Sequence, residues 1–203
     1  MRIKLAAILT VVAGLALTGC SPSSSSSNEP AVSSTSSAPD AAVFAHPNIE
    51  GLEIEFAKQP ENIVMDCYAY STLNEYGFKP SAIFGYQCDD PTVMDGVDTT
   101  GIEQIGTDGE IDLEKLAQLK PDAIVGFGTA DGWQWFKEDV NAQLTRVAPF
   151  VPLPSGDTID EGIANVRELA DFLGADLGDT NITQADKDFE AAKKNFTEAV
   201  SEK

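Results

Sequence analysis

The sequence predicts an α/β fold, an open and mostly parallel sheet with helices on both faces. Residues 63–65 and 123–128 are short apolar runs without alternation, as in strands covered on both sides. The second run follows a helix predicted over residues 112–120, which Asp112 caps and Pro121 ends. A helix that leads into a buried strand is typical of a parallel sheet. Ligands of such sheets bind beyond the carboxyl ends of the strands, so residues 127–129 mark the expected site.

The segment before this central helix is predicted to begin with a hairpin of residues 43–46 and 52–56, because its second run alternates between apolar and acidic residues. A loop holding Tyr68 and Tyr70 follows the first buried strand. The next elements are a short helix capped by Ser71 or Thr72 and closed by Gly77, a strand at residues 82–86, a long polar loop at 87–96, and a strand at 102–106.

After the central pair, a helix capped by Thr129 or Asp131 is expected. Its apolar face would hold Trp133, Phe136, Val140 and Leu144, with Trp135 on the opposite side. Prolines mark residues 148–153 as an edge strand or a strand end. Thr158 and Glu161 form a capping box for a helix whose core-facing stripe comprises Ile159, Ile163, Val166, Leu169, Ala170 and Leu173. A last helix, over residues 183–203, has no stop signal.

Composition excludes several functions. The chain has 203 residues, enough for one ordinary domain after its tails are removed but not for two full lobes. With 13 Lys and Arg against 33 Asp and Glu, its net charge of -20 repels nucleic acid and anionic lipid headgroups. The single histidine, His46, leaves no histidine-based zinc site and no Ser-His-Asp triad within the chain.

The N-terminal residues are predicted to export and anchor the protein. Residues 1–20 combine a basic start with an apolar stretch too short to span a bilayer comfortably, as in a signal peptide. They end in Leu-Thr-Gly-Cys, which resembles the lipobox of bacterial lipoproteins and implies that Cys20 is diacylated. Two acyl chains provide a stable membrane anchor, and no other covalent cofactor is expected. Residues 21–42 are serine-rich and are predicted to form a disordered tether.

The remaining cysteines, Cys67 and Cys88, are predicted to form a disulfide because an exported protein retains such bonds. Each cysteine lies two residues beyond a predicted strand, and consecutive parallel strands are often neighbours. Closing this short loop would contribute on the order of 3 kcal/mol to stability. The alternative is a pair of buried free thiols.

Two stretches carry a resemblance to a known family. Asp-Leu-Glu-Lys-Leu-Ala-Gln-Leu-Lys-Pro-Asp-Ala-Ile-Val-Gly, at residues 112–126, is similar to a signature run of the class III (iron-siderophore, haem and cobalamin) substrate-binding proteins of ABC importers. Residues 59–65 resemble the opening strand of that family, although acidic and amide residues replace its basic pair. The resemblance implies that residues 43–179 are the N-terminal ligand-binding lobe. Residues 180–203 would begin the helix that joins the two lobes, the second lobe being absent from this sequence.

Aromatic residues on the strand-end loops are the candidate ligand contacts, because flat side chains with polar tips suit a large chelate. The candidates are Tyr68, Tyr70, Tyr86, Gln87, Phe127, Trp133 and Trp135. Of the two tryptophans, Trp135 is the stronger candidate for a ligand contact, because Trp133 lies on the apolar face of the predicted helix. Only one of Tyr68 and Tyr70 is expected to face the cleft if their loop is extended. Glu114 resembles the carboxylate that, in this family, docks onto the permease. The alternative is that an acid on the first turn of a helix interacts favourably with the helix dipole.

The expected ligand is a ferric siderophore, with the hydroxamate type favoured. Arginine occurs in the lobe only at Arg146 and Arg167, so no arginine fork is predicted for an anionic catecholate. Asp66, Asp89 or Asp90 would be available for a cationic tail. Haem or cobalamin is the nearest alternative, with Tyr68, Tyr70 or Tyr86 as a haem ligand. An extracytoplasmic enzyme is a more distant alternative because no nucleophile elbow, P-loop or dinucleotide fingerprint is present, and a lone-lobe adhesin is another.

Overall fold

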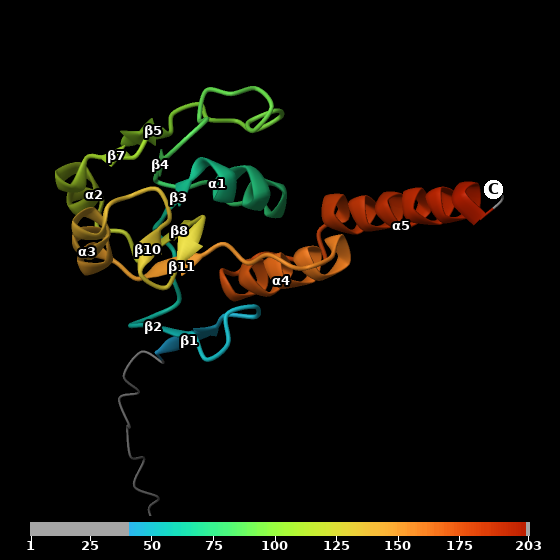
Figure 1. The fold of residues 1–203 in the computed structure, drawn as a ribbon, viewed down its shortest axis with the longest axis horizontal. Coiled ribbons are helices and arrows are strands. Elements are labelled where there is room, and N and C mark those ends of the chain that lie inside the picture. The colour runs from blue at the N-terminus through green and yellow to red at the C-terminus, as the bar shows by residue number, and fades with distance from the viewer. Residues whose placement is uncertain (1–40, 202–203) are drawn as a thin grey trace, which may run out of the picture. The chain divides into compact units, whose positions relative to one another are not determined.

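The computed structural model describes residues 41–201, and a five-stranded parallel sheet forms its centre (Figure 1). The strand order is β11-β8-β3-β4-β5, and all four neighbouring pairs are parallel. The strands are β3 (Ile63–Asp66), β4 (Ala82–Phe84), β5 (Glu103–Gln104), β8 (Ala123–Gly126) and β11 (Phe150–Pro152). The predicted open parallel sheet is confirmed, and the proline-containing strand lies at its edge as expected.

Side chains alternate between two apolar layers, one on each face of the sheet. Met65 and Val125 face a layer formed with α1 (Cys67–Leu73) and α4 (Ile159–Phe172). Val64 and Ile124 face a second layer, which Leu116 of α2 (Leu113–Leu119) and Leu144 of α3 (Glu138–Val147) help to close. Because both faces are covered, β3 and β8 are buried at every position, which explains their unbroken apolar runs.

The predicted hairpin is present as β1 (Ala42–Ala45) and β2 (Glu53–Phe56), paired antiparallel. Ile54 and Phe56 are buried whereas Glu53 and Glu55, which alternate with them, are exposed, as predicted. His46 follows the hairpin's first strand and donates from Nε2 to the carbonyl oxygen of Pro152 at 3.1 Å. This bond ties the hairpin to the edge strand of the sheet.

The first short helix begins earlier than predicted. Ser71 and Thr72 are not its caps, because α1 starts at Cys67 and its N-cap is Asp66, whose side chain accepts a hydrogen bond from Ala69 N at 2.6 Å. The residues expected in an extended loop therefore form the first turns of α1. A 3₁₀ turn, η1 (Asn74–Tyr76), follows the helix, and Gly77 closes it in the left-handed region as expected.

The segment after β8 also differs from its prediction. Instead of a helix beginning near residue 129, β9 (Gly128–Thr129) and β10 (Gly132–Trp133) form a small hairpin, and α3 starts only at Glu138. Gly132 has φ +125°, and a Cβ there would lie 2.4 Å from Asn141 Oδ1. The strand expected at 102–106 is likewise divided, because β6 (Gly106–Thr107) leaves the sheet to pair with β7 (Glu110–Ile111).

The other predicted helices form with small differences. Asp112 caps α2, accepting from Lys115 N at 2.9 Å, and Lys120 ends the helix at φ 50°. Thr158 caps α4, but Ile159 is 72% exposed and does not belong to the core stripe. The buried residues of α4 begin only at Val166, so the first turn lies beyond the part that packs on the sheet.

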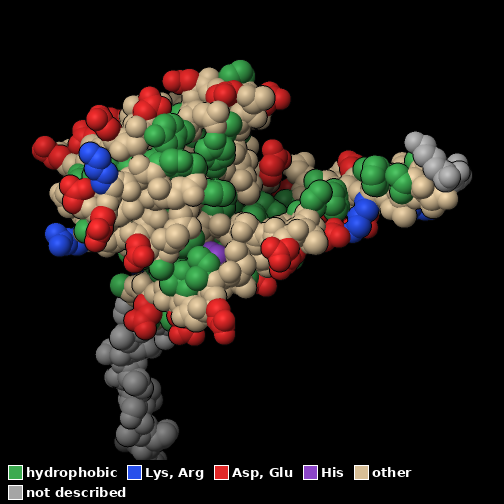
Figure 2. Space-filling model, in the orientation of Figure 1, with side chains coloured by type: hydrophobic (Ala, Val, Ile, Leu, Met, Phe, Trp, Pro, Cys, Tyr) green, Lys and Arg blue, Asp and Glu red, His purple; other side chains and the backbone are tan. Residues whose placement is uncertain are grey.

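The C-terminal helix α5 (Thr180–Ser201) contributes Ile182 to the buried residues near its start. Arg167 of α4 pairs with Asp186, and Lys193 pairs with Asp160 at 2.6 Å, so two ion pairs connect α4 with α5. Farther along, hydrophobic side chains are exposed on α5 (Figure 2), among them Phe196 at 70%. The predicted signal peptide, the lipidated Cys20 and nearly all of the tether lie outside the described residues.

Candidate functional site

The order of the strands locates the expected ligand crevice. From β3 the chain continues to β4 and β5, which lie on one side of β3 within the sheet, whereas β8 and β11 lie on the other side of β3. The direction of winding therefore reverses between β3 and β8, which are hydrogen-bonded neighbours. Open α/β sheets bind ligands beyond the carboxyl ends of the strands at such a reversal. Residues that follow β3, β4 and β8 thus form the candidate site.

Four of the predicted candidates meet at this edge and form what we call the aromatic cluster, comprising Tyr68, Tyr86, Phe127 and Trp135. Trp135 is central, with its ring centroid 6.2 Å from Tyr68, 5.5 Å from Tyr86 and 5.8 Å from Phe127. Phe127 is 43% exposed and Trp135 is 40% exposed. Side chains from the ends of three strands and from the β9–β10 hairpin region therefore offer an apolar surface open to solvent.

Gln87 adds a polar group at the rim of the aromatic cluster. Its side chain is exposed, and its Oε1 accepts a hydrogen bond from the Tyr68 hydroxyl. Its Nε2 reaches Asp90 Oδ2 at 3.4 Å. The prediction of Gln87 as a ligand contact is compatible with this position, since its amide lies beside the exposed rings.

Two predicted ligand contacts are wrong, because their side chains are buried. Tyr70 is 1% exposed, and its hydroxyl donates to the carbonyl oxygen of Asp98 at 2.7 Å. Trp133 is 0% exposed and stacks on Tyr86 at a centroid distance of 5.6 Å. Residue 70 turns into the core because its segment is helical rather than extended. Trp133 supports the aromatic cluster from beneath.

Asp66 holds the site together, a role the sequence did not predict. Its Oδ2 accepts from the backbone N–H of Phe127 and from Nε1 of Trp133, both at 2.7 Å, while Oδ1 caps α1. Burial raises the pKa of this carboxyl, although the N–H donors act in the opposite direction. The prediction that Asp66 is available for a cationic ligand tail is wrong, because its side chain is fully buried.

Asn141 of α3 fixes the β9–β10 hairpin at Trp133, two residues before Trp135. Its Oδ1 accepts from Trp133 N at 3.0 Å, and its Nδ2 donates to Trp133 O at 2.9 Å. Gly85 leaves room for the Trp133 side chain, since a Cβ at Gly85 would lie 2.9 Å from the indole ring. The sequence did not indicate this role of Asn141, because Trp133 was predicted to lie in the same helix rather than in a hairpin before it. For Asp66 the signal was an aspartate at the end of an apolar strand.

The Cys67–Cys88 disulfide borders the same site. The two sulfur atoms are bonded, with Cα atoms 5.3 Å apart, as predicted for this pair. Cys67 is 0% exposed and Cys88 is 8% exposed. The bond connects the first turn of α1 with the turn that follows β4.

Charge around the site is predominantly acidic. Acidic side chains are spread over the face seen in Figure 2, where basic ones are few. Asp89 is exposed, and the Thr92 hydroxyl and N–H lower the pKa of Asp90. Neither lobe arginine follows a sheet strand, since Arg146 lies on α3 and Arg167 on α4 pairs with Asp186. Glu114, the predicted docking residue, is exposed on the first turn of α2.

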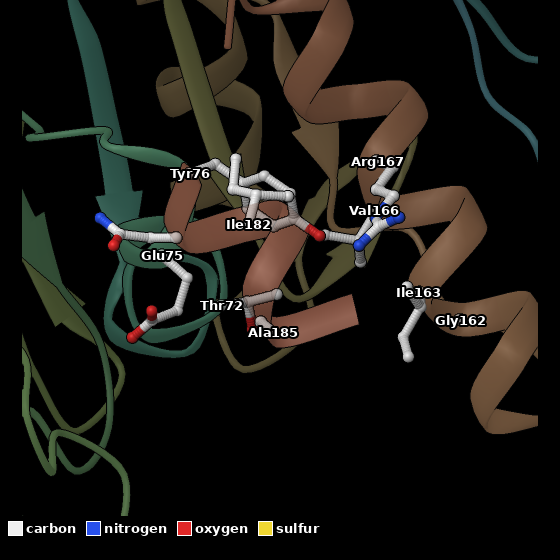
Figure 3. A pocket seen from close by; sticks show the side chains of 10 residues that line it. Thr72, Glu75, Tyr76, Gly162, Ile163, Val166, Arg167, Ile182 and Ala185 are labelled. Carbon is white, nitrogen blue, oxygen red and sulfur yellow. The ribbon is translucent and has the colours of Figure 1, made fainter. Parts of the chain in front are cut away.

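A separate apolar cavity of about 300 Å³ lies where α1 and η1 meet α4 and α5 (Figure 3). Its lining includes Tyr76, Val166, Arg167 and Ile182. Figure 3 shows the Tyr76 ring and the Arg167 guanidinium pointing toward each other. Its lining residues come from helices rather than from strand ends, so this cavity is not part of the candidate site.

An open parallel sheet with exposed aromatic residues where its winding reverses is the architecture of a binding lobe, and the sequence comparison supports this class. Residues 88–202 match the model of the periplasmic binding protein family. The chain belongs to this family, which consists of substrate-binding proteins rather than enzymes. The predicted family resemblance is therefore confirmed. A comparison with curated proteins finds no match.

Solved structures give the same fold. DesE, a ferric-siderophore receptor protein from Streptomyces coelicolor, is 25% identical, with a TM-score of 0.63 over 74% of this chain and 53% of DesE. PiuA, an iron uptake ABC transporter substrate-binding protein from Streptococcus pneumoniae, is 24% identical, with a TM-score of 0.54 over 82% of this chain and 54% of PiuA. The chain thus spans about half the length of these structures. In the described part, no helix is long and apolar enough to cross a membrane.

Proposed function

We propose that this chain is part of an extracytoplasmic substrate-binding lipoprotein that captures a ferric siderophore for an ABC importer. The observation that carries the proposal is the aromatic cluster at the carboxyl edge of β3, β4 and β8. A ferric chelate is large and partly apolar, and exposed rings contribute contact area at little entropic cost. Similarity to DesE, a ferric-siderophore receptor protein, supports the same ligand class.

Within this class, a neutral or cationic hydroxamate chelate fits the lobe best. Among residues 41–201, no arginine fork lies beside the aromatic cluster to neutralise a triply anionic catecholate complex. Exposed acidic groups such as Asp89 would repel such an anion and attract a cationic tail. Selectivity would thus come from the charge of the rim, while the rings supply the contact area.

Tryptophan fluorescence tests the ligand class directly, because the chain contains two tryptophans and the exposed one belongs to the aromatic cluster. We expect ferrioxamine-type chelates to quench this emission at lower concentration than ferric catecholates. A clear preference for the triply anionic catecholate would refute the hydroxamate assignment. A Soret band in protein purified with haem would assign the site to haem instead.

Substitution of the central ring tests the site itself. Trp135→Ala is expected to weaken chelate binding by about tenfold or more, because it removes the ring against which the other three pack. Since Trp133 remains as a reporter, binding can still be followed by fluorescence. Phe196→Ala is the control, because Phe196 is an exposed aromatic residue on α5, away from the aromatic cluster, and its loss should leave affinity unchanged. Equal affinities in both variants would contradict the site.

For the importer, we propose that Glu114 docks onto basic residues of the permease. Its carboxylate is exposed on the first turn of α2, where Gln118 Nε2 approaches it at 3.3 Å. Glu114→Arg should abolish siderophore uptake by cells while chelate binding stays intact. Glu138→Arg, an exposed acid on the first turn of α3, carries the same helix-dipole penalty and is the matched control. Equal uptake by the two variants would contradict docking through Glu114.

The proposed anchor and tether precede this lobe. We propose that Cys20 carries the lipid and that residues 21–42 hold residues 43–179 near the membrane. Cys20→Ala should abolish labelling by radioactive palmitate in cells and release the protein from the membrane fraction. Labelling that persists in this variant would contradict the lipobox assignment.

A further inference from the structure

The Cys67–Cys88 disulfide is adjacent to two residues of the proposed ligand surface. Cys67 directly precedes Tyr68, and Cys88 directly follows Gln87. The Tyr68 hydroxyl donates to Gln87 Oε1, so a hydrogen bond and a covalent bond connect the same two segments. These segments are the first turn of α1 and the turn that follows β4. The geometry of this edge of the aromatic cluster therefore depends on how firmly the two segments are joined.

The turn after β4 lacks the support that a regular element would give it. Within the described chain, residues 85–102 contain neither helix nor strand. Gln87 adopts φ 59°, a left-handed conformation that a residue with a side chain takes only when its surroundings enforce it. The backbone hydrogen bonds of residues 87–90 are local ones such as Asp90 N to Gln87 O at 3.1 Å, and the nearest long-range bond joins Gly85 N to Gly106 O at 3.2 Å. The neighbouring half-cystine is the covalent restraint on this conformation.

We propose that the Cys67–Cys88 disulfide is a positioning element of the ligand site, which holds Tyr68, Tyr86 and Gln87 in the arrangement that binds the chelate. This inference rests on the proposed siderophore-binding function and adds that chelate affinity depends on the redox state of this bond. Dithiothreitol would reduce the bond by two electrons, giving two thiols and cyclic oxidised dithiothreitol. Once released, the turn after β4 can leave the left-handed conformation at Gln87, and the Tyr68–Gln87 hydrogen bond is lost.

Chelate binding and reduction of the disulfide are thermodynamically linked, so each must affect the other. If the oxidised protein binds the chelate more tightly, the bound chelate must disfavour reduction by the same factor. Cys67 is fully buried and Cys88 is nearly so. Reduction therefore requires the turn to open, which a chelate seated on the aromatic cluster would oppose.

The test compares chelate affinity in the oxidised protein, the dithiothreitol-reduced protein and the Cys67→Ser/Cys88→Ser variant. We expect binding of a ferrioxamine-type chelate to be about tenfold weaker in the latter two, equivalent to about 1.4 kcal/mol. Dithiothreitol added to the serine variant is the control and should change nothing. Equal affinity in the oxidised and reduced proteins would overturn the proposal.

Tyr68→Phe separates positioning from general stabilisation. It keeps the ring and the disulfide but removes the hydroxyl that donates to Gln87. We expect this change to weaken binding in the oxidised protein and to have little further effect in the reduced protein. An equal loss in both redox states would show that the disulfide does not act through this pair. If the serine variant does not fold, Tyr68→Phe in the oxidised protein decides the matter, because unchanged affinity would overturn the proposal.

Hydrogen exchange of the ligand-free protein distinguishes this inference from the proposed function. Reduction should accelerate amide exchange in residues 85–90 more than in β3, β4 and β8. Unchanged exchange in this turn would overturn the positioning role, whatever ligand the chain binds. Accelerated exchange together with no chelate binding by the oxidised protein would overturn the siderophore assignment and leave the positioning role standing.

Discussion

Replacing Asp66 by asparagine tests the account of the site most sharply. The two side chains have the same shape, but the carboxylate accepts hydrogen bonds on both oxygens and the amide on one. Oδ2 accepts from Phe127 N and Trp133 Nε1, and Oδ1 accepts from Ala69 N. In its better orientation, the asparagine oxygen serves the first two donors, and its NH₂ group then faces the N–H of Ala69. One buried donor is left without an acceptor.

The expected cost follows from these bonds. A hydrogen bond to a charged group contributes about 1.5–3 kcal/mol, and asparagine loses at least one of three. Part of this loss is offset, because burial raises the pKa of Asp66 and the ionised carboxylate therefore carries a desolvation penalty. We expect Asp66→Asn to lower the free energy of unfolding by about 2 kcal/mol. Asp66→Ala, which removes all three bonds, should lower it by about 4 kcal/mol.

Urea unfolding followed by circular dichroism measures these differences, and Asp112→Asn is the matched control. Asp112 is also an N-cap, accepting from Lys115 N, but it is exposed. Asparagine caps helices about as well as aspartate, so this control should change stability by less than about 0.5 kcal/mol. The near-ultraviolet spectrum of Asp66→Asn should also change, because Trp133 loses its charged partner. Equal stabilities for the two variants would refute the role given to Asp66.

Three further predictions concern the supports of the site and of the hairpin. Burial lowers the pKa of His46 below its ordinary value of 6.5, so the unfolded chain takes up a proton first and stability should fall as the pH drops below 6.5; urea unfolding at pH 7.5 and 5.5 should show this loss in the wild type but not in His46→Gln. Asn141→Ala should lower stability by about 2 kcal/mol and weaken chelate binding, because both hydrogen bonds to the Trp133 backbone are lost. An unchanged affinity would count against a role of Asn141 in positioning the hairpin. Tyr70→Phe should lower stability by about 1 kcal/mol through loss of the bond to Asp98 O but leave chelate affinity unaltered in the fluorescence titration, whereas weaker binding would restore Tyr70 to the site.

Sequence patterns were sufficient for the features that local periodicity controls. The unbroken apolar runs at β3 and β8 indicated strands buried on both faces, and both lie centrally in the parallel sheet. Asp112 and Pro121 set the limits of α2 to within a residue. Because parallel strands end at one edge, aromatic residues that follow them could be expected to meet there, as Tyr68, Tyr86 and Phe127 do.

Only the tertiary structure decided which aromatic residues face solvent and what holds them. Tyr70 is buried because its segment, predicted as a loop, forms helix α1. Trp133 is buried because its segment, predicted as a helix, forms the β9–β10 hairpin. The three donors to Asp66 come from residues 69, 127 and 133, and the clamp on Trp133 comes from Asn141. Phe127 and Trp133 lie 61 and 67 residues from Asp66, and Asn141 lies on a different element eight residues beyond Trp133, so these partners are set by packing rather than by the spacing of residue types.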